Sequence, residues 1–151
     1  MPLSISKLNS FLFFKLPSAF FCGVRVKELS YEVCRATVTH RWINQNPFNS
    51  MYFAVQAMAA ELSTGALVMN EIQQSGQKIS MLVANNKSSF TKKATGTITF
   101  TCSDGLLVKE AVAKAIATEE GQTFWLKSVG CNQEGVHVSE MHFEWTIKLK
   151  K

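Results

Sequence analysis

The chain has 151 residues, a net charge of +5 and 46% hydrophobic residues. This length suits one domain, residues 1–151, with a single core, and the apolar content excludes a disordered chain. The basic excess is scattered and no basic stripe carries interleaved aromatic residues, so we expect no nucleic-acid partner. It indicates either a solvated surface or a phosphorylated small ligand.

The four cysteines form no Cys-x-x-Cys pair, and the three histidines lack the spacing of zinc ligands. We therefore expect no metal site, reduced cysteines and a cytoplasmic location. No apolar run is long enough to span a bilayer, and we expect no membrane partner.

Residues 1–22 predict a helical segment packed on the domain. The apolar run Phe11-Leu12-Phe13-Phe14 could be mistaken for a signal peptide, but Lys15 interrupts it and no small-x-small cleavage pattern follows in register. We predict an amphipathic helix from Ile5 to Lys15 that ends before Pro17.

Two strands are predicted next, over residues 24–29 and 32–42. In the second, one face carries Cys34, Ala36, Val38, His40 and Trp42, and polar residues alternate with them. Alternation over this length is typical of a half-buried antiparallel strand.

Residues 46–70 predict a turn followed by a buried central helix that begins near Met51. Asn46-Pro47 favours a turn, and Asn49 or Ser50 can cap the first free N–H groups of the helix. From Met51 onward the residues are mostly apolar or small, as in a helix buried all round. Glu61 is the one charge between Arg41 and Glu71, so its carboxylate needs a partner, a wet cleft or a raised pKa.

The remaining sequence predicts strands over 79–86, 94–102, 122–132 and 136–150, with a surface helix over 106–118. Residues 85–89 look irregular. The resulting order gives an α+β fold in which a mainly antiparallel sheet wraps round one apolar helix, with an extra helix before the last hairpin.

This order, together with the 46–65 stretch, resembles the hot-dog fold. More narrowly, it resembles the DUF4442 branch of the PaaI-like acyl-CoA thioesterase superfamily. The motif of that superfamily is Asn-x-x-Gly-x-x-His-Gly-Gly, with an acid seven residues further on. Asn46 and Glu61 occupy the Asn and acid positions, and Asn49 stands where Gly is usual. Tyr52, Phe53 and Ala54 stand where His-Gly-Gly is usual.

The resemblance implies thioester hydrolysis, with no cofactor and a coenzyme A thioester as substrate. Glu61 would act as base or nucleophile, Asn46 would orient the carbonyl or the water, and a backbone N–H near Phe53 would stabilise the oxyanion. Asn49, Tyr52, Phe53, Ala54, Ser63 and Thr64 would line the substrate cleft. The resemblance also implies a homodimer or a dimer of dimers, with acid and oxyanion donor from different subunits.

Two functions stay open at this point. The retained Asn46 and Glu61 favour a hydrolase, whereas the altered His-Gly-Gly positions favour a protein that binds an acyl or acyl-CoA ligand without cleaving it. A dehydratase is less favoured, because the central helix lacks the histidine it would need. Lys92, Lys93 and Lys127 could meet coenzyme A phosphates or simply be solvated. Each site residue also has a structural reading: an ion-paired Glu61, a turn at Asn46, packing rings at Tyr52 and Phe53.

Overall fold

The computed structural model describes all residues 1–151. Six strands, four α-helices and one 3-10 turn follow in the order α1 (Ile5–Lys15), α2 (Pro17–Phe21), β1 (Arg25–Leu29), β2 (Cys34–Thr39), η1 (Trp42–Asn44), α3 (Phe53–Ser75), β3 (Ile79–Phe90), β4 (Thr97–Cys102), α4 (Gly105–Thr118), β5 (Gln122–Cys131) and β6 (His137–Leu149). The predicted order of long elements is confirmed. The short helix α2, which the sequence analysis did not predict, begins at Pro17, a residue suited to the first helical position.

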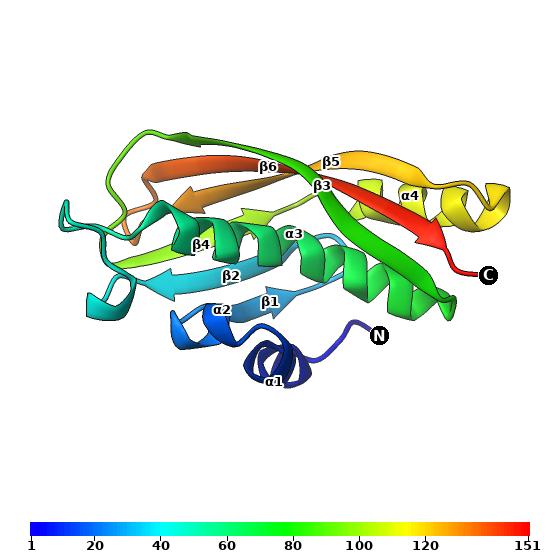
Figure 1. Ribbon diagram of the computed structural model, residues 1–151, viewed down its shortest axis with the longest axis horizontal. Helices are drawn as coiled ribbons and strands as arrows, with labels where there is room; N and C mark the ends of the chain where they lie inside the picture. The colour runs from blue at the N-terminus through cyan, green and yellow to red at the C-terminus, as the bar shows by residue number, and fades with distance from the viewer.

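The six strands form one antiparallel sheet in the order β1-β2-β4-β5-β6-β3. The long helix α3 runs across one face of this sheet, and α1 and α2 lie beside β1 (Figure 1). Alternate residues of β2, β4 and β6 point toward α3 and are buried, including Ala36, Val38, Ile98, Phe100 and Ile147. The helix thus forms the centre of the core, as the sequence predicts.

Helix α3 begins two residues later than predicted, at Phe53, with Tyr52 as its N-cap. No side chain caps it, and the expected capping by Asn49 or Ser50 is wrong because Ser50 is hydrogen-bonded to Asn46 instead. The helix ends at Gly76, whose φ of 70° suits the left-handed terminating position.

Small residues let α3 approach the sheet closely. Ala59, Ala60 and Ala66 have no exposed surface, and larger side chains there would collide with the strands. Ala57 is only half-buried, so the expectation of a helix buried all round is wrong at this position.

Two other local predictions are corrected. Strand β2 ends at Thr39, and Trp42 begins a 3-10 turn with its side chain 82% exposed, not on the inner face. Residues 85–89 are not irregular, because β3 continues to Phe90 through a bulge between Val83 and Asn85 and keeps pairing with β6.

The two edge strands of the sheet, β1 and β3, differ in whether their outer backbone groups have a hydrogen-bond partner. At β1, the Asn9 side chain of α1 accepts a hydrogen bond from the Val26 N–H (2.9 Å) and donates one to the Val26 carbonyl (3.1 Å). This amide thus occupies the outer edge of β1 as a neighbouring strand would. At the other edge, the 12-residue strand β3 pairs only with β6.

The four cysteines are free, and burial raises the pKa of the Cys34 and Cys102 thiols to about 12. No helix of the chain combines the length and the apolar character needed to cross a bilayer.

Candidate functional site

Glu61 lies in the middle of α3 and faces a cavity of about 310 Å³ between this helix and the turn that joins α1 to α2. We call it the Glu61 cavity; its lining is Lys15, Leu16, Pro17, Ser18, Ala19, Met58, Glu61 and Leu62. One helical turn further on, Gly65 leaves space for the Trp145 ring, and the Glu61 carboxyl lies beside it. A Cβ at Gly65 would lie 3.5 Å from Glu61 Oε1 and 3.1 Å from Cζ2 of Trp145.

The Glu61 carboxyl forms no salt bridge and no hydrogen bond within the chain, and its oxygens are not fully buried. Its backbone carbonyl accepts a hydrogen bond from Thr64 Oγ1, but its side chain accepts none. Burial raises the pKa of Glu61 above its ordinary value, because the low-dielectric surroundings disfavour the charged form. The ion-paired reading of this residue therefore has no support within the single chain.

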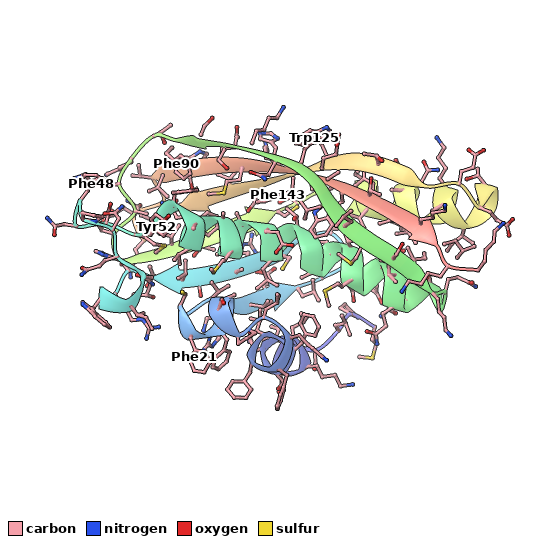
Figure 2. All side chains as sticks on the ribbon, viewed as in Figure 1. Phe21, Phe48, Tyr52, Phe90, Trp125 and Phe143 are labelled. Carbon is pink, nitrogen blue, oxygen red and sulfur yellow. The ribbon has the colours of Figure 1, made fainter.

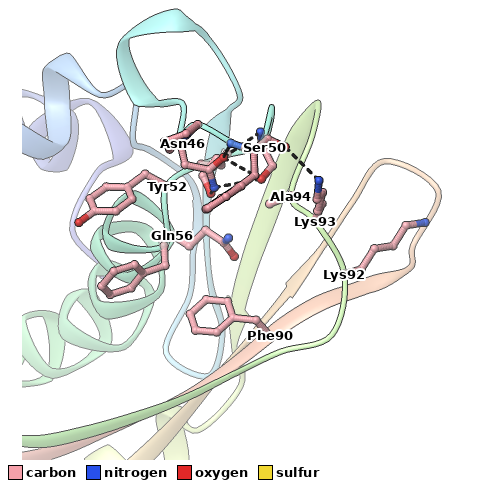
Figure 3. Close-up of a pocket in the computed structure, with 12 residues that line it drawn as sticks. Asn46, Ser50, Tyr52, Gln56, Phe90, Lys92, Lys93 and Ala94 are labelled. Atoms are coloured by element: carbon pink, nitrogen blue, oxygen red, sulfur yellow. Dashed lines mark hydrogen bonds between the residues drawn. The ribbon is translucent and has the colours of Figure 1, made fainter.

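A second cavity, of about 490 Å³, lies at the N-terminal end of α3 (Figure 3). We call it the aromatic pocket; it is lined by Asn46, Pro47, Phe48, Ser50, Met51, Tyr52, Phe53, Gln56, Phe90, Lys92, Lys93 and Ala94. The Phe53 ring stacks edge-on against Tyr52 (centroids 5.1 Å apart) and Phe90 (6.2 Å). The two cavities share no residue, so the chain separates Asn46, Tyr52 and Phe53 from Glu61.

Asn46 holds the loop before α3 in place. Its Oδ1 accepts hydrogen bonds from the N–H groups of Phe48 (2.9 Å) and Ser50 (3.2 Å), and its Nδ2 donates to Ser50 Oγ (3.0 Å) and Met51 O (3.3 Å). The amide is thus committed to its own loop, as the turn reading of Asn46 expects. Any part it has in chemistry is therefore through the position of the helix N-terminus.

Asn49, at the motif position where glycine is usual, has a φ of 60°. This left-handed conformation favours glycine, and asparagine tolerates it better than most other residues. The substitution therefore preserves the backbone course of the loop. The Asn49 side chain is exposed and does not line the aromatic pocket.

The first residues of α3 present free N–H groups. Phe53 and Ala54 are its first two residues, and N–H groups at these positions have no partner within a helix. The Tyr52 carbonyl accepts from Val55 N and Gln56 N, which closes the first turn behind them. A backbone donor thus exists where the thioesterase motif requires one, but the Tyr52 and Phe53 rings, about half exposed, stand beside it.

Ser63 and Thr64 are buried and line neither cavity. Ser63 Oγ donates to Ala60 O and shares a hydrogen bond of 2.7 Å with Ser128 Oγ on β5. Thr64 Oγ1 accepts from Trp145 Nε1 at 2.9 Å. Both hydroxyls therefore join α3 to the sheet, and the expectation that they line the substrate cleft does not hold within this chain.

Gln56 is a pocket residue that the sequence analysis did not single out. It is buried, lines the aromatic pocket, and its Oε1 accepts a hydrogen bond of 2.9 Å from Ser139 Oγ on β6. The signal was a polar amide inside an apolar helical run, one turn after the motif residue Phe53.

The three lysines considered for phosphate binding lie in two places. Lys92 and Lys93 line the aromatic pocket, where Lys93 Nζ donates to Phe48 O at 3.0 Å (Figure 3). Lys127 lines a different cavity and lies 4.0 Å from Glu140. No three His, Cys, Asp or Glu side chains are grouped closely enough to hold a metal ion.

Solved structures with the same fold include several thioesterases. A Pseudomonas aeruginosa protein of unknown function, named a probable thioesterase, matches with a TM-score of 0.83 and 20% identity over 99% of both chains. A protein of unknown function from Chlorobaculum tepidum matches with a TM-score of 0.83 and 15% identity over 96% of this chain and 94% of its own. Thioesterase HI1161 from Haemophilus influenzae matches with a TM-score of 0.74 and 9% identity over 99% and 93%. These likenesses confirm the hot-dog fold.

No curated protein matches the chain. The family model described as a domain of unknown function, DUF4442, matches residues 6–147. This range contains both cavities and the whole sheet except the last two residues of β6. The chain therefore belongs to the DUF4442 family.

Proposed function

We propose that this protein is a thioesterase-like hydrolase in which the Glu61 carboxylate acts on a thioester bound between two copies of the chain. The observation that carries the proposal is the Glu61 carboxyl itself. It is a partly buried acid on the central helix, it faces a cavity, and it has no structural partner within the chain. Burying such a group destabilises a protein, so its presence at a cavity indicates a functional role.

One chain alone does not bring the required groups together. Glu61 lies eight residues after Phe53 on α3, about 12 Å at the rise of an α-helix. A base and an oxyanion donor must both reach the same carbonyl group, which is about 3 Å from each. The donor for a given Glu61 is therefore assigned to a second copy.

The unpaired edge at β3 supports this homodimer. A two-fold axis perpendicular to the sheet at this edge would join two sheets into one and set two α3 helices antiparallel on the same face. The N-terminus of each helix would then lie toward the middle of the other. The β1 edge is less suited, because Asn9 already occupies it. A dimer of dimers would keep this contact.

The proposed hydrolysis begins with attack of water on the thioester carbon. The Glu61 carboxylate takes a proton from water while the water oxygen attacks the thioester carbon, and the oxyanion is held by the backbone N–H near Phe53. Collapse of the intermediate breaks the C–S bond, and the thiolate receives the proton. In the nucleophilic version, a Glu61 oxygen attacks first and water cleaves the resulting anhydride. The substrate class that we propose is a coenzyme A thioester, with Lys92 and Lys93 near the nucleotide phosphates.

A second function, binding of an acyl or acyl-CoA ligand without hydrolysis, is favoured by one specific observation. Tyr52 and Phe53 replace the small motif residues beside the free helix N–H groups, and their rings line the aromatic pocket. Bulk at this point would hinder a carbonyl from reaching the donor.

A panel of acyl-CoA esters assayed for released thiol tests the proposal. Glu61→Gln should retain the fold and lower turnover by roughly 10²–10⁴ fold, the usual contribution of a positioned base. Glu71→Gln, on the same helix, is the matched control and should hydrolyse like wild type. Equal turnover by Glu61→Gln and wild type would make the carboxylate structural. No turnover of any ester by wild type, together with thermal stabilisation by acyl-CoA, would establish the binding function instead.

A further inference from the structure

Helices α1 and α2 carry a cluster of exposed aromatic side chains. Phe13, Phe14 and Phe21 are 44%, 75% and 57% exposed, and Phe13 stacks edge-on against Phe14 and Phe20 at 5.0 and 5.1 Å. Figure 2 shows Phe21 at the lower face of the molecule, directed away from α3 and the sheet. Large exposed aromatic rings that gather on one face of a domain are typical of a site that contacts another protein or a membrane.

Beside this cluster lies a basic cradle of about 540 Å³ on the outer face of the sheet. Gly23, Arg25, Lys27, Thr37, Thr39, Arg41 and Thr97 line it, and no lining residue is acidic or hydrophobic. Neither arginine nor Lys27 takes part in a salt bridge within the chain. Burial, and then repulsion from Arg41, lower the pKa of Arg25, as expected for neighbouring cations that lack an anion.

The cluster and the cradle form one continuous surface. The Arg25 guanidinium lies 3.6 Å from the centroid of the Phe20 ring, and Phe20 in turn contacts Phe13 and Phe21. Arg25 also donates hydrogen bonds of 2.8 Å to the carbonyls of Phe20 and Val24, which fix it at the junction. Cationic and aromatic side chains are therefore held next to one another by the fold.

The charges of this segment are all of one sign. Residues 1–27 contain Lys7, Lys15, Arg25 and Lys27, and the first acidic residue of the chain is Glu28. The same residues contain five of the eleven phenylalanines. Exposed aromatic rings beside unneutralised cations match the interface of an anionic bilayer, where rings enter the headgroup region and cations meet phosphates.

We propose that the α1–α2 face and the basic cradle together dock this protein reversibly on membranes that contain anionic phospholipids. In this proposal the chain lies on such a surface and does not cross it, in contrast to the expectation from the sequence that it has no membrane partner. The proposal is independent of the hydrolase function, because the Glu61 carboxyl and the aromatic pocket take no part in it.

Co-sedimentation of the full chain with vesicles tests this docking. Wild type should partition onto phosphatidylcholine vesicles that contain phosphatidylglycerol, and much less onto pure phosphatidylcholine. Lys27→Gln should lower the partition coefficient about fivefold, and the double change Phe14→Ser with Phe21→Ser about tenfold or more. Leu106→Ser and Lys109→Gln, exposed positions of α4, are the matched controls and should bind like wild type.

Several results would overturn the proposal. Wild type could fail to bind the anionic vesicles, or it could bind both kinds of vesicle equally. The α4 control variants could also lose as much vesicle binding as the variants of the proposed surface. If the double phenylalanine variant instead breaks a larger assembly into smaller units in sedimentation, a second copy covers this face and the membrane proposal fails. Lys27→Gln changes only an exposed side chain, so it tests the charge contribution even if the double variant does not fold.

Discussion

The two cavities on α3 differ in what they offer to a substrate. The aromatic pocket has free backbone donors, stacked rings and two lysines, but no acid in its lining. The Glu61 cavity has the acid, but the start of the helix and its free donors lie elsewhere. Each cavity therefore has one half of what hydrolysis needs. This difference supports the proposal that the hydrolytic unit is a pair of chains, and the predictions that follow test this division.

Apart from Glu61→Gln, the largest expected effect concerns the donor at the aromatic pocket. Phe53→Pro removes one N–H at the first helical position, where proline is well tolerated, and Tyr52 already has the extended conformation that suits a residue before proline. Phe53→Ala removes the same ring but keeps the N–H. If this N–H holds the oxyanion, the turnover of Phe53→Pro should be ~10²–10³ fold below that of Phe53→Ala.

Thiol release from acyl-CoA esters, measured beside thermal melting of both variants, gives this comparison. Equal turnover of the two folded variants would exclude the Phe53 N–H as the donor.

Mixing two inactive variants sharpens the comparison. Glu61→Gln lacks the acid and Phe53→Pro lacks the donor, so dimers of either variant alone should be nearly inactive. After unfolding and refolding together in equal amounts, half of the dimers are mixed, and each mixed dimer has one complete site. Activity should recover to about a quarter of wild type. No recovery, with mixed dimers verified by differential tagging, would show that each site is built from one chain.

Replacement of the loop amide should have a moderate effect. Asn46→Ala removes the five side-chain hydrogen bonds of Asn46 in the loop before α3 and should lower the free energy of unfolding by ~1–3 kcal/mol. It should lower turnover by no more than ~10-fold, because Asn46 acts only through the position of the helix N-terminus.

Asn132→Ala is the matched control for this change, since Asn132 Oδ1 accepts from Glu134 N and Val136 N in a remote hairpin turn. Denaturant unfolding and thiol release should show stability losses in both variants, with an activity loss in Asn46→Ala alone. A loss of activity much larger than ~10-fold in Asn46→Ala would instead indicate that Asn46 contacts the substrate or the water directly.

The smallest expected effect is on the pH dependence of the free energy of unfolding. The pKa of Glu61 is raised in the folded protein above its ordinary value of 4.5, so the unfolded chain loses this proton first as pH rises. Ionisation of Glu61 therefore lowers the free energy of unfolding as the pH rises from about 4.5 to the pKa of Glu61 in the folded protein. At higher pH the loss of stability stays constant. Below that window both states are protonated and the contribution vanishes.

Glu61→Gln should accordingly melt above wild type at neutral pH, and the difference should close as the pH falls. Glu71→Gln is the reference for a change of charge on the same helix. A melting temperature of Glu61→Gln below that of wild type at neutral pH would indicate a stabilising partner for the carboxylate, as in the ion-paired reading.

Much of the fold could be predicted because burial leaves periodic patterns. The alternation of Ile98, Phe100 and Cys102 identifies an inner strand face, and all three are buried. The predictions that were wrong lie where alternation continues past the end of pairing. Trp42 has the right spacing for the inner face of β2, but the chain has already turned away from the sheet. In β3, the polar residues beyond the bulge show no strand pattern in the sequence. The strand nevertheless continues there, because its backbone pairs with β6.

The candidate site could be predicted in part for the same reason. A lone acid in an apolar helix is visible in the sequence, and Glu61 was found in this way. Gln56 carried a weaker signal of the same kind, because an amide can be satisfied by one neighbour, here Ser139, which only the folded sheet brings close. For Ser63 and Thr64 the resemblance implies a place in the cleft, but the sequence does not show which side of α3 faces β5 and β6.

By itself, the sequence determined the class of fold, the central helix and its single carboxyl, because apolar periodicity and the absence of charge are local properties of the chain. The tertiary structure decided which groups share a cavity. Hydrogen bonds commit Asn46 to its loop and Thr64 to Trp145. Asn9 covers one edge of the sheet, whereas the outer edge of β3 stays unpaired. Such partners lie far apart in sequence, and their choice depends on register and packing that no local pattern encodes.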